Sequence, residues 1–172
     1  MQLSSRAVDR EAAREFFTHA IPDVYGYLLH RLRDRVVAED LTSETMVAAI
    51  RGLGSSPTEL PSLAWLIGIA RHKLLDHWRR EARDQRHLEM ISANTSRTTF
   101  VDDVPDAGRA QDALALLSAN YRAVLTLRYV DQLSVAEVAT LMQRSFHATE
   151  KLLVRARAEL RDRYYQTGAG DD

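Results

Sequence analysis

Apolar residues that recur every three and four positions in the first half of the chain are the feature that most constrains its fold. Side chains at these steps share one face of an α-helix. Only 7 Gly and 4 Pro are present among 172 residues, so turns are few. The sequence therefore predicts an all-α fold. The first stripe consists of Phe16, Phe17, Ala20, Ile21, Val24, Tyr25, Leu28, Leu29 and Leu32.

Breaks in this pattern predict where the early helices end. Pro22 is expected to divide residues 9–32 into two helices, because proline is accommodated best in a first helical turn. A third helix is expected at about 35–53, and the Gly-, Ser- and Pro-rich residues 52–61 end it. A fourth begins near Ser62 and continues past Trp78. The apolar stripe expected for the third helix is Val36, Val37, Leu41, Met46, Val47 and Ile50.

A polar and acidic stretch separates the two halves of the chain. Residues 88–108 are rich in small, polar and acidic side chains, and a segment of that length without structure is unusual inside one domain. The sequence predicts two small helical domains, residues 9–87 and 109–166, joined by a flexible linker. The second domain is expected to hold short helices at 110–117, 119–130, 135–142 and 146 to about 165.

The charge is distributed unevenly although the net charge is only −1. Residues 71–86 and 144–163 each hold six Lys/Arg against three Asp/Glu, and residues 88–112 hold five acidic against two basic residues. Two basic segments can bind phosphates locally while the total cancels. The same pattern also fits solvated helix faces.

Several classes of protein are disfavoured by composition. Cysteine is absent, which excludes disulfides and thiolate chemistry. No two of the six His residues are three or four apart, and no phosphate-binding loop or nucleophile motif is present. No signal peptide is apparent, and the apolar runs are too short to span a bilayer. We expect a cytoplasmic protein without membrane insertion, enzymatic activity, metal or cofactor.

Residues 133–157 have the pattern of a helix-turn-helix. Ser134 and Glu137 have capping-box spacing at the start of its first helix, and Ser145 is an N-cap for the second. The second helix of such a motif reads bases in the major groove with its N-terminal half. Its start could also grip a phosphate through backbone N–H groups. The positions expected to face solvent there are His147, Ala148, Lys151, Leu152 and Arg155.

These segments together resemble extracytoplasmic-function (ECF) sigma factors, which belong to the bacterial sigma-70 family. Residues 119–129, the helix-turn-helix and residues 155–160 resemble region 4. The acidic segment 38–46 and the segments 64–71 and 76–80 resemble region 2. The resemblance covers most of residues 13–165 apart from the linker. It implies that the chain binds core RNA polymerase and directs promoter recognition and DNA melting.

The resemblance also implies a role for particular residues. Asp40 and Glu44, with the neighbouring Ser43 and Met46, would bind the clamp helices of the largest polymerase subunit. The −10 element would be held by Gly54, Ser55, Ser56, Thr58, Arg71, Lys73, Trp78, Arg79 and Arg80. The −35 element would be bound by Arg144, Ser145, His147, Ala148, Lys151, Leu152 and Arg155. Further partners implied are the polymerase flap region and an anti-sigma factor.

Some positions depart from the family's pattern. Ser43 stands where Gln is usual and Met46 where Phe is usual, which leaves the polymerase contacts less defined. Gln143 replaces the usual Gly in the helix-turn-helix, so this turn is expected to be built somewhat differently. Residues 146–151 also differ from the common recognition helix, so the −35 sequence stays open. Of the two tryptophans, Trp65 is expected in the core, whereas Trp78 is undecided between the core and base stacking.

One alternative function remains from the sequence. A stand-alone helix-turn-helix regulator, with residues 1–87 as a helical sensing or dimerisation domain, would also bind duplex DNA. Such a protein has no need of an acidic helix followed by a basic one in its first half.

Overall fold

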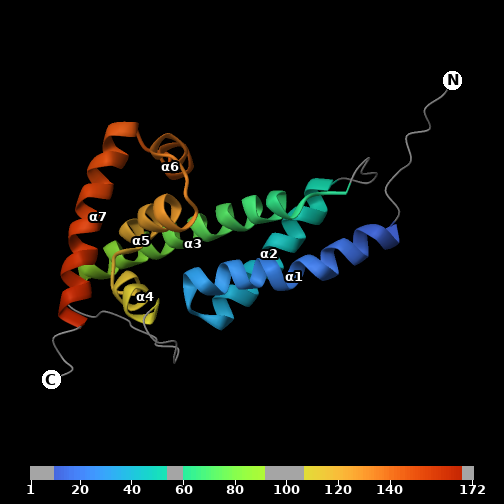
Figure 1. Ribbon diagram of the computed structural model, residues 1–172, viewed down its shortest axis with the longest axis horizontal. Helices are drawn as coiled ribbons and strands as arrows, with labels where there is room; N and C mark the ends of the chain where they lie inside the picture. Colours follow the sequence, from blue (N-terminus) through green and yellow to red (C-terminus); the bar gives the residue numbers. More distant parts are fainter. Residues whose placement is uncertain (1–9, 54–59, 92–106, 168–172) are drawn as a thin grey trace. The chain divides into compact units, whose positions relative to one another are not determined.

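The computed structural model describes residues 10–53, 60–91 and 107–167, and all regular secondary structure in these ranges is helical. The prediction of an all-α fold is confirmed. None of the helices in the described part of the chain has the length and apolar character needed to cross a membrane. The helices are α1 (Arg10–Leu32), α2 (Arg35–Leu53), α3 (Leu63–Ile91), α4 (Ala107–Ala115), α5 (Ala119–Leu125), the π-helical η1 (Thr126–Val130), α6 (Val135–Met142) and α7 (Phe146–Thr167) (Figure 1).

Helix α1 runs without interruption through Pro22, so the predicted division into two helices is wrong. A proline inside a helix removes one backbone hydrogen bond and crowds the preceding turn. Ala20, Val24 and Leu28 on either side of it are buried, with exposed fractions of 4% or less. Burial of this stripe outweighs the local preference of one residue.

The chain forms two compact units, Met1–Leu74 and Leu75–Asp172, which divide within α3. In the first unit α1 and α2 lie side by side (Figure 1). Arg33 ends α1 in a left-handed conformation (φ 55°), and the side chain of Asp34 accepts a hydrogen bond from the Val37 N–H at 3.1 Å. The core of this unit includes Val24, Leu28, Ala38, Leu41, Ala49, Leu66, Ala70 and Leu74.

The second unit is organised around α7, which packs against α4, α5 and α6 (Figure 1). Its described core includes Ala113, Leu117, Ala123, Val124, Leu127, Val138, Ala139, Leu153 and Ala156. The helix predicted at 119–130 is present, but after Leu125 it widens into η1, where Asp131 N–H bonds to the Thr126 carbonyl at 2.9 Å. Ser118 occupies the predicted N-cap position without a capping bond from its side chain.

The predicted domain boundaries at 87 and 109 stay a prediction. Helix α3 extends to Ile91, into the segment expected to be the linker, and α4 begins at Ala107. The rest of that segment lies outside the described residues.

Candidate nucleic-acid and polymerase interfaces

Helices α6 and α7 form a helix-turn-helix with a capped start. Ser134 Oγ accepts a hydrogen bond from Glu137 N–H at 3.3 Å, and the Glu137 carboxylate accepts one from Ser134 N–H at 2.8 Å. Two N–H groups that the helix itself cannot satisfy are thereby paired. The predicted capping box is confirmed, and it fixes where α6 begins.

The turn between the two helices has the left-handed residue that glycine usually supplies. Gln143 has φ 54° and ψ 46°. Its N–H bonds to the Thr140 carbonyl at 3.1 Å, and Arg144 N–H bonds to the Ala139 carbonyl at 2.9 Å. These are the two hydrogen bonds of a Schellman motif. The expectation that Gln143 alters the turn is therefore wrong. The turn has the left-handed conformation that glycine usually adopts, and the backbone of Gln143 is strained because this residue has a Cβ.

We expect Gln143→Gly to stabilise the protein by about 0.5–1 kcal/mol. The left-handed conformation costs a residue with a Cβ about 1–2 kcal/mol, and the greater backbone entropy of unfolded glycine offsets part of the gain. Urea unfolding followed by circular dichroism measures the change. Gln143→Ala keeps the Cβ and serves as the control, with little or no gain expected. Equal unfolding midpoints for the Gly and Ala variants would contradict this account.

Helix α7 is buried on one face and exposed on the other. Thr149, Leu153 and Ala156 are 5% exposed or less, and Leu160 is half-buried, so the face predicted to pack inward does so. On the outer side His147, Lys151 and Arg155 are exposed, whereas Ala148 and Leu152 are half-buried at its edge. The predicted base-reading residues therefore share one side of α7, with the three longest of them in solvent.

Ser145 is engaged in capping α7. Its Oγ accepts a hydrogen bond from Ala148 N–H at 3.2 Å, and its carbonyl accepts one from Thr149 Oγ1 at 3.0 Å. Arg144, beside it, is exposed. The serine therefore orients the start of the helix. The Arg144 side chain at this turn is exposed to solvent, where a phosphate could approach it.

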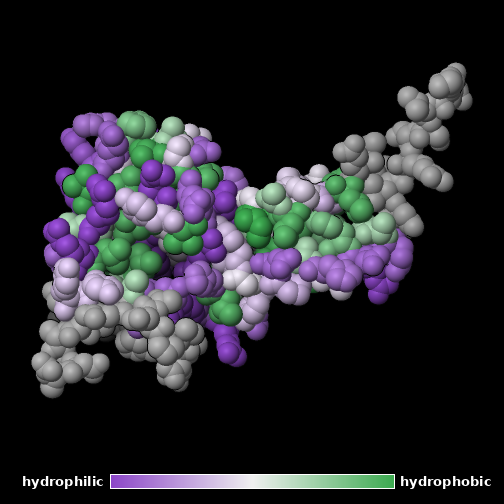
Figure 2. Space-filling view, in the orientation of Figure 1, coloured by the Kyte–Doolittle hydropathy of each residue, from purple (hydrophilic) through white to green (hydrophobic). Residues whose placement is uncertain are grey.

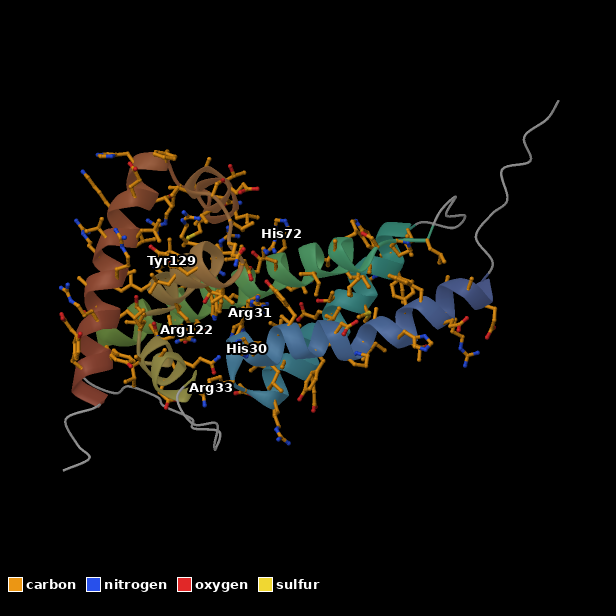
Figure 3. All side chains as sticks on the ribbon, viewed as in Figure 1. His30, Arg31, Arg33, His72, Arg122 and Tyr129 are labelled. Atoms are coloured by element: carbon orange, nitrogen blue, oxygen red, sulfur yellow. The ribbon has the colours of Figure 1, made fainter. Side chains whose placement is uncertain are left out.

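The residues predicted to bind the −10 element divide between two sides of α3. Lys73 and Arg80 are seven apart and share one side, and Arg71 and Trp78 share another. Arg80 is exposed, whereas Arg71, Lys73 and Arg79 are half-buried. The exposed His72, which points outward from α3 (Figure 3), is a further polar residue that sequence reasoning missed. Gly54, Ser55, Ser56 and Thr58 lie outside the described residues.

The expectation that Trp65 lies in the core is wrong, and Trp78, which the sequence left undecided, is the buried tryptophan. Trp78 is 1% exposed and Trp65 is 38% exposed. In this structure Trp78 therefore has no open face for stacking on a base, although it was among the predicted −10 contacts. The ring of Trp65 lies over Gly52, where an added Cβ would be 3.5 Å from Cζ2. Trp65 thus covers the end of α2, immediately before the segment 54–59.

Helix α2 presents a mixed acidic and apolar face to solvent. Asp40, Ser43 and Glu44 are exposed and Met46 is half-buried. Val36, Val47 and Ile50 are 68%, 46% and 57% exposed, so three residues of the predicted apolar stripe do not face the core. The spacing of Val36, Asp40, Ser43, Val47 and Ile50 is that of one side of a coiled-coil helix. On the face of this unit that Figure 2 shows, hydrophobic residues are gathered together and hydrophilic residues line one edge.

An ion pair joins two predicted contacts of different kinds. Lys73 Nζ lies 3.1 Å from a Glu44 carboxylate oxygen, and the two side chains are 32% and 45% exposed. An exposed pair of this kind contributes about 0–1 kcal/mol. The structure therefore brings a proposed polymerase contact on α2 next to a proposed DNA contact on α3.

A metal centre is not indicated by the described ranges, which contain no cluster of three or more His, Asp or Glu side chains placed to hold an ion. The arrangement offers instead a basic recognition helix, a basic stretch of α3 and a mixed face on α2. These features suit binding of nucleic acid and of a helical protein surface.

Comparison with known proteins matches both halves of the chain. Residues 16–84 match the family model of sigma-70 region 2, and residues 107–160 match that of sigma-70 region 4. The ECF RNA polymerase sigma factor SigD of Mycobacterium tuberculosis is 30% identical, over 94% of this chain and 81% of SigD. The chain belongs to the ECF sigma factors.

Two further relatives extend the match. The ECF RNA polymerase sigma factor BldN of Streptomyces coelicolor is 32% identical over 91% of this chain, which spans 62% of BldN's length. The RNA polymerase sigma factor YlaC of Bacillus subtilis is 28% identical over 88% of this chain and 91% of YlaC. The fold resembles that of the sigma factor RpoE of Bartonella quintana, solved with the anti-sigma factor NepR. That resemblance has a TM-score of 0.54 at 19% identity and covers 87% of this ECF sigma factor and 94% of RpoE.

Proposed function

We propose that this ECF sigma factor binds core RNA polymerase and directs it to promoters through a −35 and a −10 element. The observation that carries the proposal is the helix-turn-helix, whose α7 buries Thr149 and Leu153 and exposes Lys151 and Arg155. It lies in one chain with the region 2 helices, which a regulator acting alone does not need. The stand-alone regulator is therefore the less favoured function.

Recognition of the −35 element is assigned to the N-terminal half of α7. Lys151 and Arg155 suit guanine edges or phosphates, and the apolar edge formed by Ala148 and Leu152 suits thymine methyl groups. Arg144 and the capped helix start are placed to engage the DNA backbone. The strain at Gln143 falls at the turn that sets the angle between α6 and α7.

Recognition of the −10 element is assigned to α3 and the segment before it. Arg71, Lys73, Arg79 and Arg80 provide positive charge for a single strand, and segment 54–59 would receive a base extruded from the duplex. Trp65 has an exposed ring that lies over Gly52, two residues before that segment in the sequence, and it suits a base better than the buried Trp78. The sigma factor would supply binding energy for DNA opening and would carry out no covalent chemistry.

Polymerase binding is assigned to α2. Its exposed stripe of Val36, Asp40, Ser43, Val47 and Ile50 has the spacing of a helix that packs along another helix. We place the clamp helices of the largest polymerase subunit against it, and the flap region against region 4. Because polymerase and DNA are its proposed partners, we also propose that the protein acts in the cytoplasm. We further propose that an anti-sigma factor binds it.

The experiment that tests the function is run-off transcription with core RNA polymerase. We expect specific transcripts from a cognate promoter only when core polymerase and the protein are both present. A gel-shift assay with the protein alone provides the comparison, and weak duplex binding is expected there. Tight binding to a palindromic duplex, without stimulation on any cognate template, would favour the stand-alone regulator.

A further inference from the structure

The first half of α7 carries one side chain of the opposite charge among its basic residues. Residues 146–157 hold three basic side chains, Lys151, Arg155 and Arg157, and a single acidic one, Glu150. Glu150 is exposed and directly precedes Lys151, which is assigned to the −35 element. A carboxylate at this place repels the phosphates of any DNA that the helix approaches. It therefore lowers the affinity for DNA in general, unless the DNA offers it a partner.

The Glu150 side chain leans toward the start of α7, where the base-reading residues lie. One of its carboxylate oxygens is 3.7 Å from Nδ1 of His147, and the side chains of His147 and Glu150 are 74% and 49% exposed. Side chains on a helix tilt toward its N-terminus, so this contact follows from the helix geometry. His147 is one of the residues assigned to the −35 element. Glu150 therefore reaches the same edge of α7 as a residue assigned to base recognition.

Stability of the helix does not account for Glu150. The first turn of α7 contains no acidic residue, and the interaction of a carboxylate with the helix dipole falls off within that turn. An exposed His–Glu pair contributes little to the free energy of unfolding, and it is ionic only when the histidine is protonated. Ser145, rather than Glu150, caps the start of the helix. Removal of the Glu150 carboxylate is therefore expected to leave the fold intact.

The major groove of DNA offers a carboxylate few partners. An ionised Glu side chain accepts hydrogen bonds and donates none. Guanine presents two acceptors in the major groove, and thymine presents an acceptor and a methyl group. Cytosine and adenine present an amino donor, but in adenine the N7 acceptor lies beside it. Cytosine is therefore the base whose own edge fits a carboxylate without an opposing acceptor.

We infer that Glu150 is a specificity-determining residue, which accepts a hydrogen bond from a cytosine amino group in the −35 element and disfavours the other bases there. This role rests on the proposed function, since it takes α7 as the recognition helix. The discrimination comes from repulsion as well as attraction, because a base without a donor leaves the carboxylate facing an acceptor. Lys151 and Arg155 attract DNA, and Glu150 restricts which sequence is bound.

A pool of promoter duplexes with a randomised −35 element tests this role. The duplexes retained by the intact protein with core polymerase are sequenced, and so are those retained by the protein alone. We expect one position of the element at which cytosine, on one of the two strands, is enriched at least about fivefold over the mean of the other bases. The position should be the same with and without polymerase, since the same helix reads it.

Variants of Glu150 provide the decisive comparison. Glu150→Gln introduces an amide that pairs with adenine N6 and N7, so the preference at that position should change from cytosine to adenine. Glu150→Ala should lose the preference at that position and retain at least as much DNA in total, since the repelling charge is gone. Glu159→Gln is the matched control, because it removes a carboxylate further along α7, paired with Arg163 at 3.0 Å, and should keep the cytosine preference. Circular dichroism verifies that each variant is folded.

The outcomes separate this role from the proposed function. Absence of a cytosine preference in the wild-type protein, or an unchanged preference in both Glu150 variants, overturns the role even if the protein directs transcription. Weaker retention of all sequences, with the base preference unchanged, overturns it too, because a purely structural residue would give that result. Failure to direct transcription from any retained promoter rejects the proposed function instead. A cytosine preference that Glu150→Gln converts to adenine supports the role in that case as well.

Discussion

Replacing Lys151 and Arg155 together by alanine is expected to reduce promoter-specific transcription at least about 30-fold while core polymerase binding is unchanged. Both side chains are exposed on the N-terminal half of α7, opposite the buried Thr149 and Leu153. A lost base contact costs about 1–3 kcal/mol. The costs of two lost contacts add, so the factors by which they lower the initiation rate multiply. Since neither side chain contributes to the core of the unit, the fold should be retained.

Run-off transcription measures this effect, and fluorescence anisotropy with labelled protein measures core binding. The matched control is Arg157→Ala with Arg161→Ala, which removes the same charge from exposed positions further along α7. We expect the control to weaken transcription much less, and by a similar factor on all promoters, since the distal half of a recognition helix can at most touch phosphates. Equal losses in both pairs would mean that net charge, rather than base recognition, governs this helix. A loss of core binding would mean that this face of α7 contacts polymerase.

Much of the helix-turn-helix could be predicted because its determinants are local. The Ser134–Glu137 capping box and the Ser145 cap each depend on residues within four positions of one another, and both form as expected. The periodicity of Thr149, Leu153 and Ala156 likewise identifies the buried face of α7. Local hydrogen bonds and helical spacing are encoded directly in the order of residues.

The errors occurred where packing between distant segments outweighs a local preference. Pro22 is accommodated inside α1 because the residues around it are buried. Gln143 adopts a left-handed conformation because α6 and α7 impose that turn. The burial of Trp78 and the exposure of Trp65 also depend on which surfaces meet, which neither an apolar run nor basic neighbours reveal.

The exposed face of α2 could have been found from the sequence. Apolar character alone predicts Val36, Val47 and Ile50 as part of the inward stripe, yet Leu41, Thr45 and Ala49 occupy the buried side. The signal that separates them is heptad spacing through Asp40 and Ser43. An apolar stripe interrupted by polar residues is typical of a helix that packs against a partner rather than against its own core.

This reassigned stripe carries the second large expected effect. Val47→Asp combined with Ile50→Asp should weaken core polymerase binding at least about 100-fold, because burying a carboxylate against apolar surface costs several kcal/mol. The free protein should stay folded, since the two side chains are 46% and 57% exposed before the change. Transcription should fall in parallel and should recover partly when the protein concentration is raised.

Ile21 provides the control for this prediction. It is 45% exposed on α1 in the same unit, so Ile21→Asp introduces a carboxylate at a position as accessible as Val47 but on another helix. We expect core binding within about twofold of wild type for Ile21→Asp and a large loss for Val47→Asp, measured by anisotropy under the same conditions. If the two single variants bound equally well, α2 would not be the polymerase-binding helix. The exposed valines and isoleucine would then belong to a different interface, and Asp40 and Glu44 would lose their assigned partner with them.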